Sequence, residues 1–165
     1  MLGKLSTSLD AVENVFAVIG GVLLVFNSLS VVIEVLLRSF FNISFYWVIE
    51  INEYILLYLP FLGAAWLLRD NGHITVDLLT DVLNFKTIKI LDILIAIIGI
   101  IVSVVFVWFG TVETMELLEK GSRSSTVLEF PLALAAIIIP LGSVLLLLEF
   151  VRKCYNSIIR VEETV

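Results

Sequence analysis

The sequence predicts an all-α integral membrane protein with four transmembrane helices and a short amphipathic helix at the cytoplasmic surface. Hydrophobic residues make up 60% of the 165 residues and charged residues only 16%, whereas about 45–50% apolar residues is usual in soluble domains. The mean hydropathy is +1.11. Charged residues separate four apolar windows, most of them close to the ~20 residues that cross a bilayer. We therefore expect a single membrane domain over residues 1–165.

The four expected spans cover residues 12–37, 46–68, 90–115 and 131–151. The first follows Lys4 as a secretory signal would, but its apolar run exceeds the ~7–15 residues of a signal and lacks a small-residue cleavage site, so we interpret it as a retained helix. The second is long enough only if it begins at Tyr46, which puts Glu50 and Glu53 in its first two turns, near an interface. Pro131 fits the first turn of the fourth span, where its missing N–H costs little.

Basic residues predict the orientation of these spans. Of the 10 lysines and arginines, only Arg38, Lys120 and Arg123 fall on the side opposite the termini. Loops rich in lysine and arginine stay in the cytoplasm. We therefore expect a multi-pass protein with both termini cytoplasmic.

A shorter helix is expected between the second and third spans. Over residues 75–86, apolar residues recur at helical spacing while Asp77 and Asp81 lie on the opposite face. A membrane-surface helix ordinarily carries Lys or Arg there to meet anionic lipid, so the acidic face predicts packing against protein. His73 is interpreted as a hydrogen-bond donor to Asp70 or Asp77, or as a helix cap, with a pH switch as the weaker alternative.

Composition also excludes several function classes. A net charge of −6 provides no basic surface for nucleic acid. Cys154 is the single cysteine and His73 the single histidine, so the chain has no intramolecular disulfide, no cysteine-clustered metal site and no bis-histidine haem. No nucleophile with a base, ligand cluster or pocketed carboxylate pair can be assembled, so we expect no enzyme activity, cofactor or metal. A haem-free anchor for an enzyme complex stays open.

Two groups of charged residues lie near the expected spans. Glu50 and Glu53 are neighbours on one helix, where repulsion could poise one of them for proton relay, although an interfacial pair or a contact with cations of another helix is favoured. Glu34 precedes Arg38 by one helical turn, the favourable order for an ion pair, so a structural pair is favoured over a substrate site. No charged residue is expected at a helix midplane, which indicates a helical support rather than a self-sufficient transporter.

Small residues and prolines inside the spans indicate helix contacts and local breaks. Gly63 and Gly142 stand where helices could touch. Pro60 and Pro140 each remove a helical hydrogen bond, and with these glycines they keep a second function open: an autonomous proton-coupled four-helix transporter that acts as a dimer. Trp47, within an aromatic cluster, is expected to anchor the second span at headgroup level.

The second span and the loop after it resemble a known family. Residues 61–65 are Phe-Leu-Gly-Ala-Ala, and Arg69 is followed at residues 72–77 by Gly-His-Ile-Thr-Val-Asp. The match continues along the chain with Arg38, Trp47, Glu50, Phe130-Pro131 and Ile139-Pro140-Leu141-Gly142. In these motifs the chain resembles the small membrane subunit, or DctQ-like Q subunit, of tripartite ATP-independent periplasmic (TRAP) transporters.

The resemblance implies a heterodimer with a larger membrane subunit in the bacterial inner membrane, served by a soluble periplasmic substrate-binding protein. The large subunit would be an elevator that couples uptake of organic acids to a sodium gradient, while this chain, surrounded by membrane lipid, would enlarge the static scaffold. Many family members carry a basic residue where Glu53 aligns, so a partner contact made there would differ. The residues expected at partner interfaces or in structural roles are Arg38, Trp47, Glu50, Glu53, Gly63, Arg69, His73, Asp77, Asp81, Pro131, Pro140 and Gly142.

Overall fold

The structure is a computed structural model that describes residues 2–70, 85–126 and 128–162, with side chains over 7–70, 90–126 and 128–157. Its helices are α1 (Leu2–Phe41), α2 (Tyr46–Arg69), α4 (Phe85–Glu119), α5 (Leu132–Ala136) and α6 (Ile138–Glu162). No strand occurs in the described part of the chain, so the all-α prediction is confirmed. The amphipathic helix expected over 75–86, with His73, Asp77 and Asp81, lies outside the described residues, except that residues 85 and 86 belong to α4.

Within the described residues, four helical stretches are long and apolar enough to cross a membrane. They are Thr7–Phe41, Tyr46–Arg69, Ile90–Glu119 and Leu132–Ser157. Helix α1 has 40 residues and α4 has 35, well beyond the ~20 that a bilayer core requires. These helices continue past the expected spans because the polar residues at their ends are compatible with a helix and no proline interrupts them.

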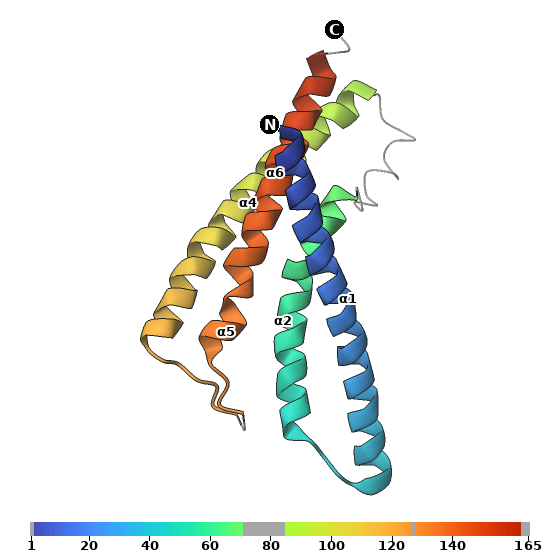
Figure 1. The fold of residues 1–165 in the computed structure, drawn as a ribbon, viewed down its shortest axis with the longest axis vertical. Coiled ribbons are helices and arrows are strands. Elements are labelled where there is room, and N and C mark those ends of the chain that lie inside the picture. Colours follow the sequence, from blue (N-terminus) through green and yellow to red (C-terminus); the bar gives the residue numbers. More distant parts are fainter. Residues whose placement is uncertain (1, 71–84, 127, 163–165) are drawn as a thin grey trace.

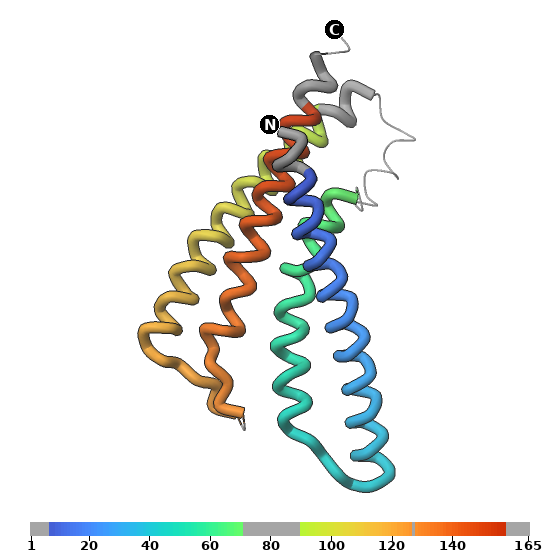
Figure 2. Tube along the Cα trace, in the orientation of Figure 1, coloured from blue at the N-terminus to red at the C-terminus, as the bar shows by residue number. Residues whose placement is uncertain are grey.

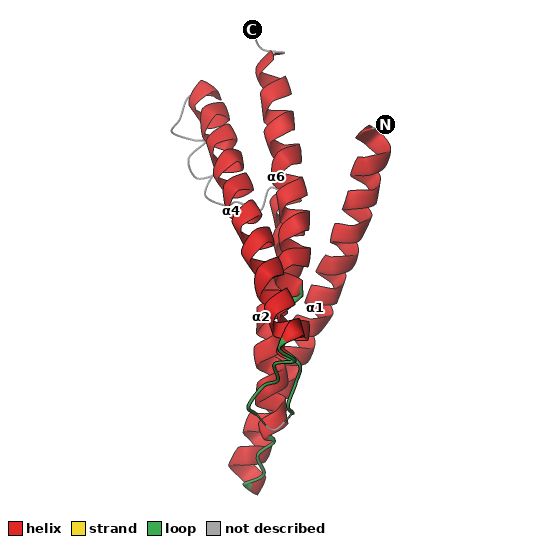
Figure 3. Cartoon of the chain, turned by 90° about the vertical axis from the view of Figure 1, so that its left-hand side faces the viewer, coloured by secondary structure: helices red, strands yellow, loops and turns green. Residues whose placement is uncertain are grey.

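The helices form two antiparallel pairs (Figure 1). Helix α1 packs on α2 and α4 packs on α6, while α2 also packs on α6 and so joins the pairs. The trace in Figure 2 shows that the connections after α1 and after α4 lie at the end of the molecule away from both termini. In the view turned by 90°, α1 and α4 diverge on either side of α6 toward the end of the molecule where the N- and C-termini lie (Figure 3). The two pairs therefore cross at an angle instead of forming a parallel bundle.

Close backbone contacts set the crossing between the helices. A Cβ added to Gly142 of α6 would lie 2.6 Å from the Cβ and 2.7 Å from the carbonyl oxygen of Phe61 in α2. Within the pair of α4 and α6, Gly99 faces the ring of Phe150 and Gly110 faces Ile139 at comparably short range. Small residues let membrane helices approach in this way, and packing rather than the hydrophobic effect then holds them together.

Prolines shape the fourth span. Pro140 cannot donate to the carbonyl of Ala136, and the helix is interrupted at Ile137, between α5 and α6. Pro131 is the N-cap of α5 rather than a residue of its first turn, because it forms an isolated antiparallel bridge with Arg123 that keeps its backbone extended. Pro60 lies inside α2, which remains a single helix.

Candidate functional site

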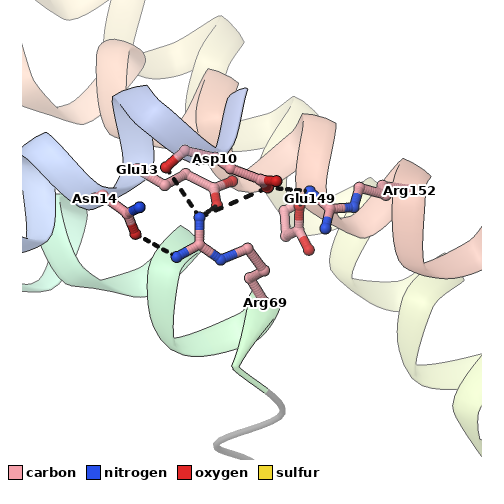
Figure 4. A network of polar contacts seen from close by, with 6 residues as sticks. All are labelled: Asp10, Glu13, Asn14, Arg69, Glu149 and Arg152. Carbon is pink, nitrogen blue, oxygen red and sulfur yellow. Dashed lines mark hydrogen bonds and ion pairs between the residues drawn. The ribbon is translucent and has the colours of Figure 1, made fainter. Parts of the chain in front are cut away.

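Among the described residues, the largest group of charged side chains in contact lies where α1, α2 and α6 meet (Figure 4). The N-terminal third of α1 supplies two carboxylates and an amide. The last residue of α2 supplies a guanidinium group, and α6 supplies one carboxylate and one guanidinium group. We call this group the three-helix cluster; its members are Asp10, Glu13, Asn14, Arg69, Glu149 and Arg152.

Arg69 is the centre of contact between α2 and α1. Its Nη1 lies 3.0 Å from Oε2 of Glu13 and donates a hydrogen bond of 3.0 Å to the backbone carbonyl of Asp10. Its Nη2 donates to Oδ1 of Asn14 at 2.5 Å. The side chain of Glu13 is 0% exposed and that of Arg69 is 18% exposed, so this ion pair is shielded from solvent. One guanidinium group therefore holds the C-terminal end of α2 against the N-terminal third of α1.

Arg152 makes the corresponding contact from α6. Its Nη1 donates to Oδ1 of Asp10 at 2.6 Å and lies 3.4 Å from Oε2 of Glu149. The same Asp10 oxygen is 3.6 Å from Arg69, so Asp10 lies between the two guanidinium groups. The cluster thereby ties together three helices that come from distant parts of the chain.

The cluster is not electrically balanced. Within the described part of the chain, three carboxylates meet two guanidinium groups, a formal excess of one negative charge. Oε2 of Glu13 and Oε2 of Glu149 are buried with only these ion pairs as partners, and Oε1 of Glu13 is buried without a hydrogen bond. Burying a carboxylate costs free energy unless it is paired and fully hydrogen-bonded. A further cation, or a proton on one carboxylate, would therefore stabilise the cluster.

A second polar site, which we call the Glu50 anchor, lies near the other end of α2. The Glu50 side chain is buried, and its Oε1 accepts a hydrogen bond of 3.1 Å from the hydroxyl of Tyr54. Its Oε2 accepts one of 3.2 Å from the backbone N–H of Leu128, in the connection between α4 and α5. The ring of Tyr54 stacks on Phe130 of the same connection, with centroids 4.7 Å apart. Glu50 thus fastens this connection to α2.

The structure separates the two carboxylates that sequence places together. Glu53 is exposed whereas Glu50 is buried. The two residues therefore face different surroundings. The two polar sites are also far apart, since the rise of an α-helix puts Glu50 and Arg69 about 28 Å from each other along α2, close to the thickness of a hydrocarbon core. No charged residue lies between Glu53 and Arg69 in α2.

The predicted pair of Glu34 and Arg38 is present but weak. Nε of Arg38 lies 3.8 Å from Oε1 of Glu34, and the Arg38 side chain is 56% exposed. The hydroxyl of Ser44 donates to the same Glu34 oxygen at 3.3 Å. Trp47 is exposed at the start of α2, with its ring edge-on to Phe45. Only 7% of the Glu34 side chain is exposed, so its ion pair with Arg38 joins a buried carboxylate to a guanidinium group at the surface.

Sequence reasoning singled out Arg69 but missed its partners. Asp10 with Glu13, and Glu149 with Arg152, are each spaced at three residues, so each pair faces one side of its helix. That spacing was the available signal, but it does not say which helix lies opposite. Among the described residues, no group of three His, Cys, Asp or Glu side chains is arranged to hold a metal ion.

Comparison with known proteins points to one family. The family model for the DctQ component of tripartite ATP-independent periplasmic transporters matches residues 27–160. This stretch is well over half of the chain and includes the Glu50 anchor together with Arg69, Glu149 and Arg152, whereas it begins after Asp10 and Glu13. A comparison with curated proteins finds no match.

Proposed function

Since this chain belongs to the DctQ component family of tripartite ATP-independent periplasmic transporters, we propose that it is the small scaffold subunit of a sodium-coupled uptake system for organic acids. In this proposal a larger membrane subunit holds the substrate and ion sites and moves as an elevator. A periplasmic binding protein delivers the solute. This chain provides part of the static surface against which the elevator moves.

The placement of buried charge carries the scaffold assignment. Arg69 and Arg152 tie α1 to α2 and α6, and Glu50 ties the connection between α4 and α5 to α2. A transport pathway ordinarily needs polar or ionisable groups near the midplane, facing a cavity. Here the charges of α2 lie near its two ends and are used to hold helices and a loop in place. Such contacts favour rigidity over solute movement.

The same proposal includes an orientation. The three-helix cluster lies toward the ends of the chain that we assign to the cytoplasm, and the Glu50 anchor lies toward the periplasm of a bacterial inner membrane. The excess of lysine and arginine on the terminal side supports this assignment. The connection between α4 and α5 would then face the binding protein.

Reconstitution tests the proposal. Proteoliposomes would contain the large subunit with this chain, the large subunit alone, or this chain alone, each with the binding protein outside and an inward sodium gradient. Radiolabelled dicarboxylates and sialic acids would be the probes. We expect sodium-dependent uptake only when both membrane subunits are present. Uptake by this chain alone, or equal uptake by the large subunit without it, would contradict the scaffold role.

A further inference from the structure

Helices α1 and α2 leave a groove open on the outside of their contact, which we call the α1–α2 groove. Its volume is about 500 Å³. Small residues line much of it, and Asn14 and Trp66 line it as well. The small residues are Ala17, Gly20, Gly21 and Gly63. Toward the three-helix cluster the groove ends at Asn14, whose amide oxygen accepts the hydrogen bond from Arg69. The groove and the cluster are therefore continuous.

The glycines of this groove differ from the other glycines within the spans. Gly99, Gly110 and Gly142 each face atoms of a neighbouring helix that an added Cβ would approach closer than 3.0 Å. At Gly21 and Gly63, an added Cβ would meet nothing within 4 Å. Glycine inside a helix costs about 0.5–1 kcal/mol relative to alanine. Packing within the chain explains the first set of glycines and leaves Gly21 and Gly63 without a reason.

Charge indicates what kind of partner fits beside the groove. The cluster at its end has an excess of one carboxylate among the described residues, and Glu13, which is buried, has only Arg69 as a partner, with its Oε1 left without a hydrogen bond. The side chain of Asp10 is 37% exposed and so is accessible from outside. A cationic side chain that reached Asp10 would balance the cluster, and a hydrocarbon chain of a lipid would not.

We propose that a transmembrane helix of the large membrane subunit lies in the α1–α2 groove, with a lysine or arginine near its cytoplasmic end against Asp10. This inference rests on the proposed function and names the face on which the two subunits meet. Glycine at positions 21 and 63 allows two helix backbones to approach closely. A second copy of this chain fits poorly, because pairing the same face would bring two clusters with excess negative charge together.

Photo-crosslinking tests the face directly. The photoreactive residue p-benzoylphenylalanine would replace Val18, which lines the groove and is 67% exposed, or as a control Val105 of α4, which is 47% exposed. After irradiation of native membranes, we expect Val18 to yield an adduct with the mass of the large subunit, at least tenfold more than Val105. An adduct with a second copy of this chain, an adduct with lipid only, or preference for Val105 would overturn the proposal.

Substitutions that add bulk in the groove or remove charge at its end give a second test. This test distinguishes failure of the proposed interface from failure of the proposed function. The unmodified chain must first co-purify with the large subunit; if it does not, the proposed function itself fails. Given that, we expect Gly63→Leu and Asp10→Asn to lower recovery of the large subunit at least fivefold, and Gly63→Ala to lower it less than Gly63→Leu does. Full recovery with Gly63→Leu would move the interface elsewhere and leave the scaffold role intact.

Discussion

Gly142→Ala is expected to destabilise this chain because the new methyl group has no room between α6 and α2. It would lie 2.6 Å from Cβ of Phe61 and 2.7 Å from the Phe61 carbonyl oxygen, whereas ordinary van der Waals contact begins at 3.4 Å. The obstacle includes backbone, which cannot rotate away as a flexible side chain can. Helices α2 and α6 would have to separate by most of an ångström.

Overpacking of this kind costs about 1–3 kcal/mol, which corresponds to a roughly 5- to 150-fold shift in the unfolding equilibrium. Gly63→Ala in α2 is the matched control. It makes the same change in helix propensity as Gly142→Ala but adds its methyl group into open space. Unfolding in mixed micelles with increasing SDS, followed by the fluorescence of the three tryptophans, measures both variants. Equal midpoints for Gly142→Ala and Gly63→Ala would refute the steric argument.

Charge contacts give two further comparisons. In the same unfolding assay, Arg69→Gln is expected to cost about 3–5 kcal/mol because it leaves the buried carboxylate of Glu13 without its partner. Lys120→Gln is the control, since both Lys120 and its partner Glu116 are exposed, and it should cost far less because exposed ion pairs contribute little. Similar losses would show that burial does not matter here. Glu50→Ala removes the acceptor that fastens the connection between α4 and α5, at about 1–1.5 kcal/mol, so hydrogen exchange there should accelerate roughly tenfold. Glu53→Ala, at an exposed carboxylate, should leave that exchange unchanged, and unchanged exchange in both variants would remove the anchor role of Glu50.

Much of the architecture follows from local sequence pattern. The apolar windows and the charges between them predict an all-α membrane protein, and the structure has four helical stretches of sufficient length and hydropathy. The ion pair of Glu34 and Arg38 was predictable because both residues lie on one helix, where spacing alone determines distance. The interruption near Pro140 was predictable for a similar reason, since a missing N–H acts on the carbonyl four residues earlier.

Contacts between helices were less accessible. The sequence marks Gly63 and Gly142 alike as small residues in apolar segments, yet Gly142 is pressed against Phe61 while Gly63 faces an open groove. Glu50 and Glu53 likewise look equivalent, but the helix rotation buries the first and exposes the second. Each difference depends on where a neighbouring helix lies, and hydropathy contains no information on that.

The sequence by itself therefore determined the class of protein, its membrane-spanning segments and, through motifs along the second span, its resemblance to a transporter family that the family comparison confirms. Tertiary structure alone decided that Asp10, Glu13, Arg69, Glu149 and Arg152 meet in one cluster. The physical reason is the range of the interactions. Transfer into a bilayer and helix formation depend on neighbours within a few turns, whereas an ion pair between helices depends on crossing angles set by close packing far away in the sequence.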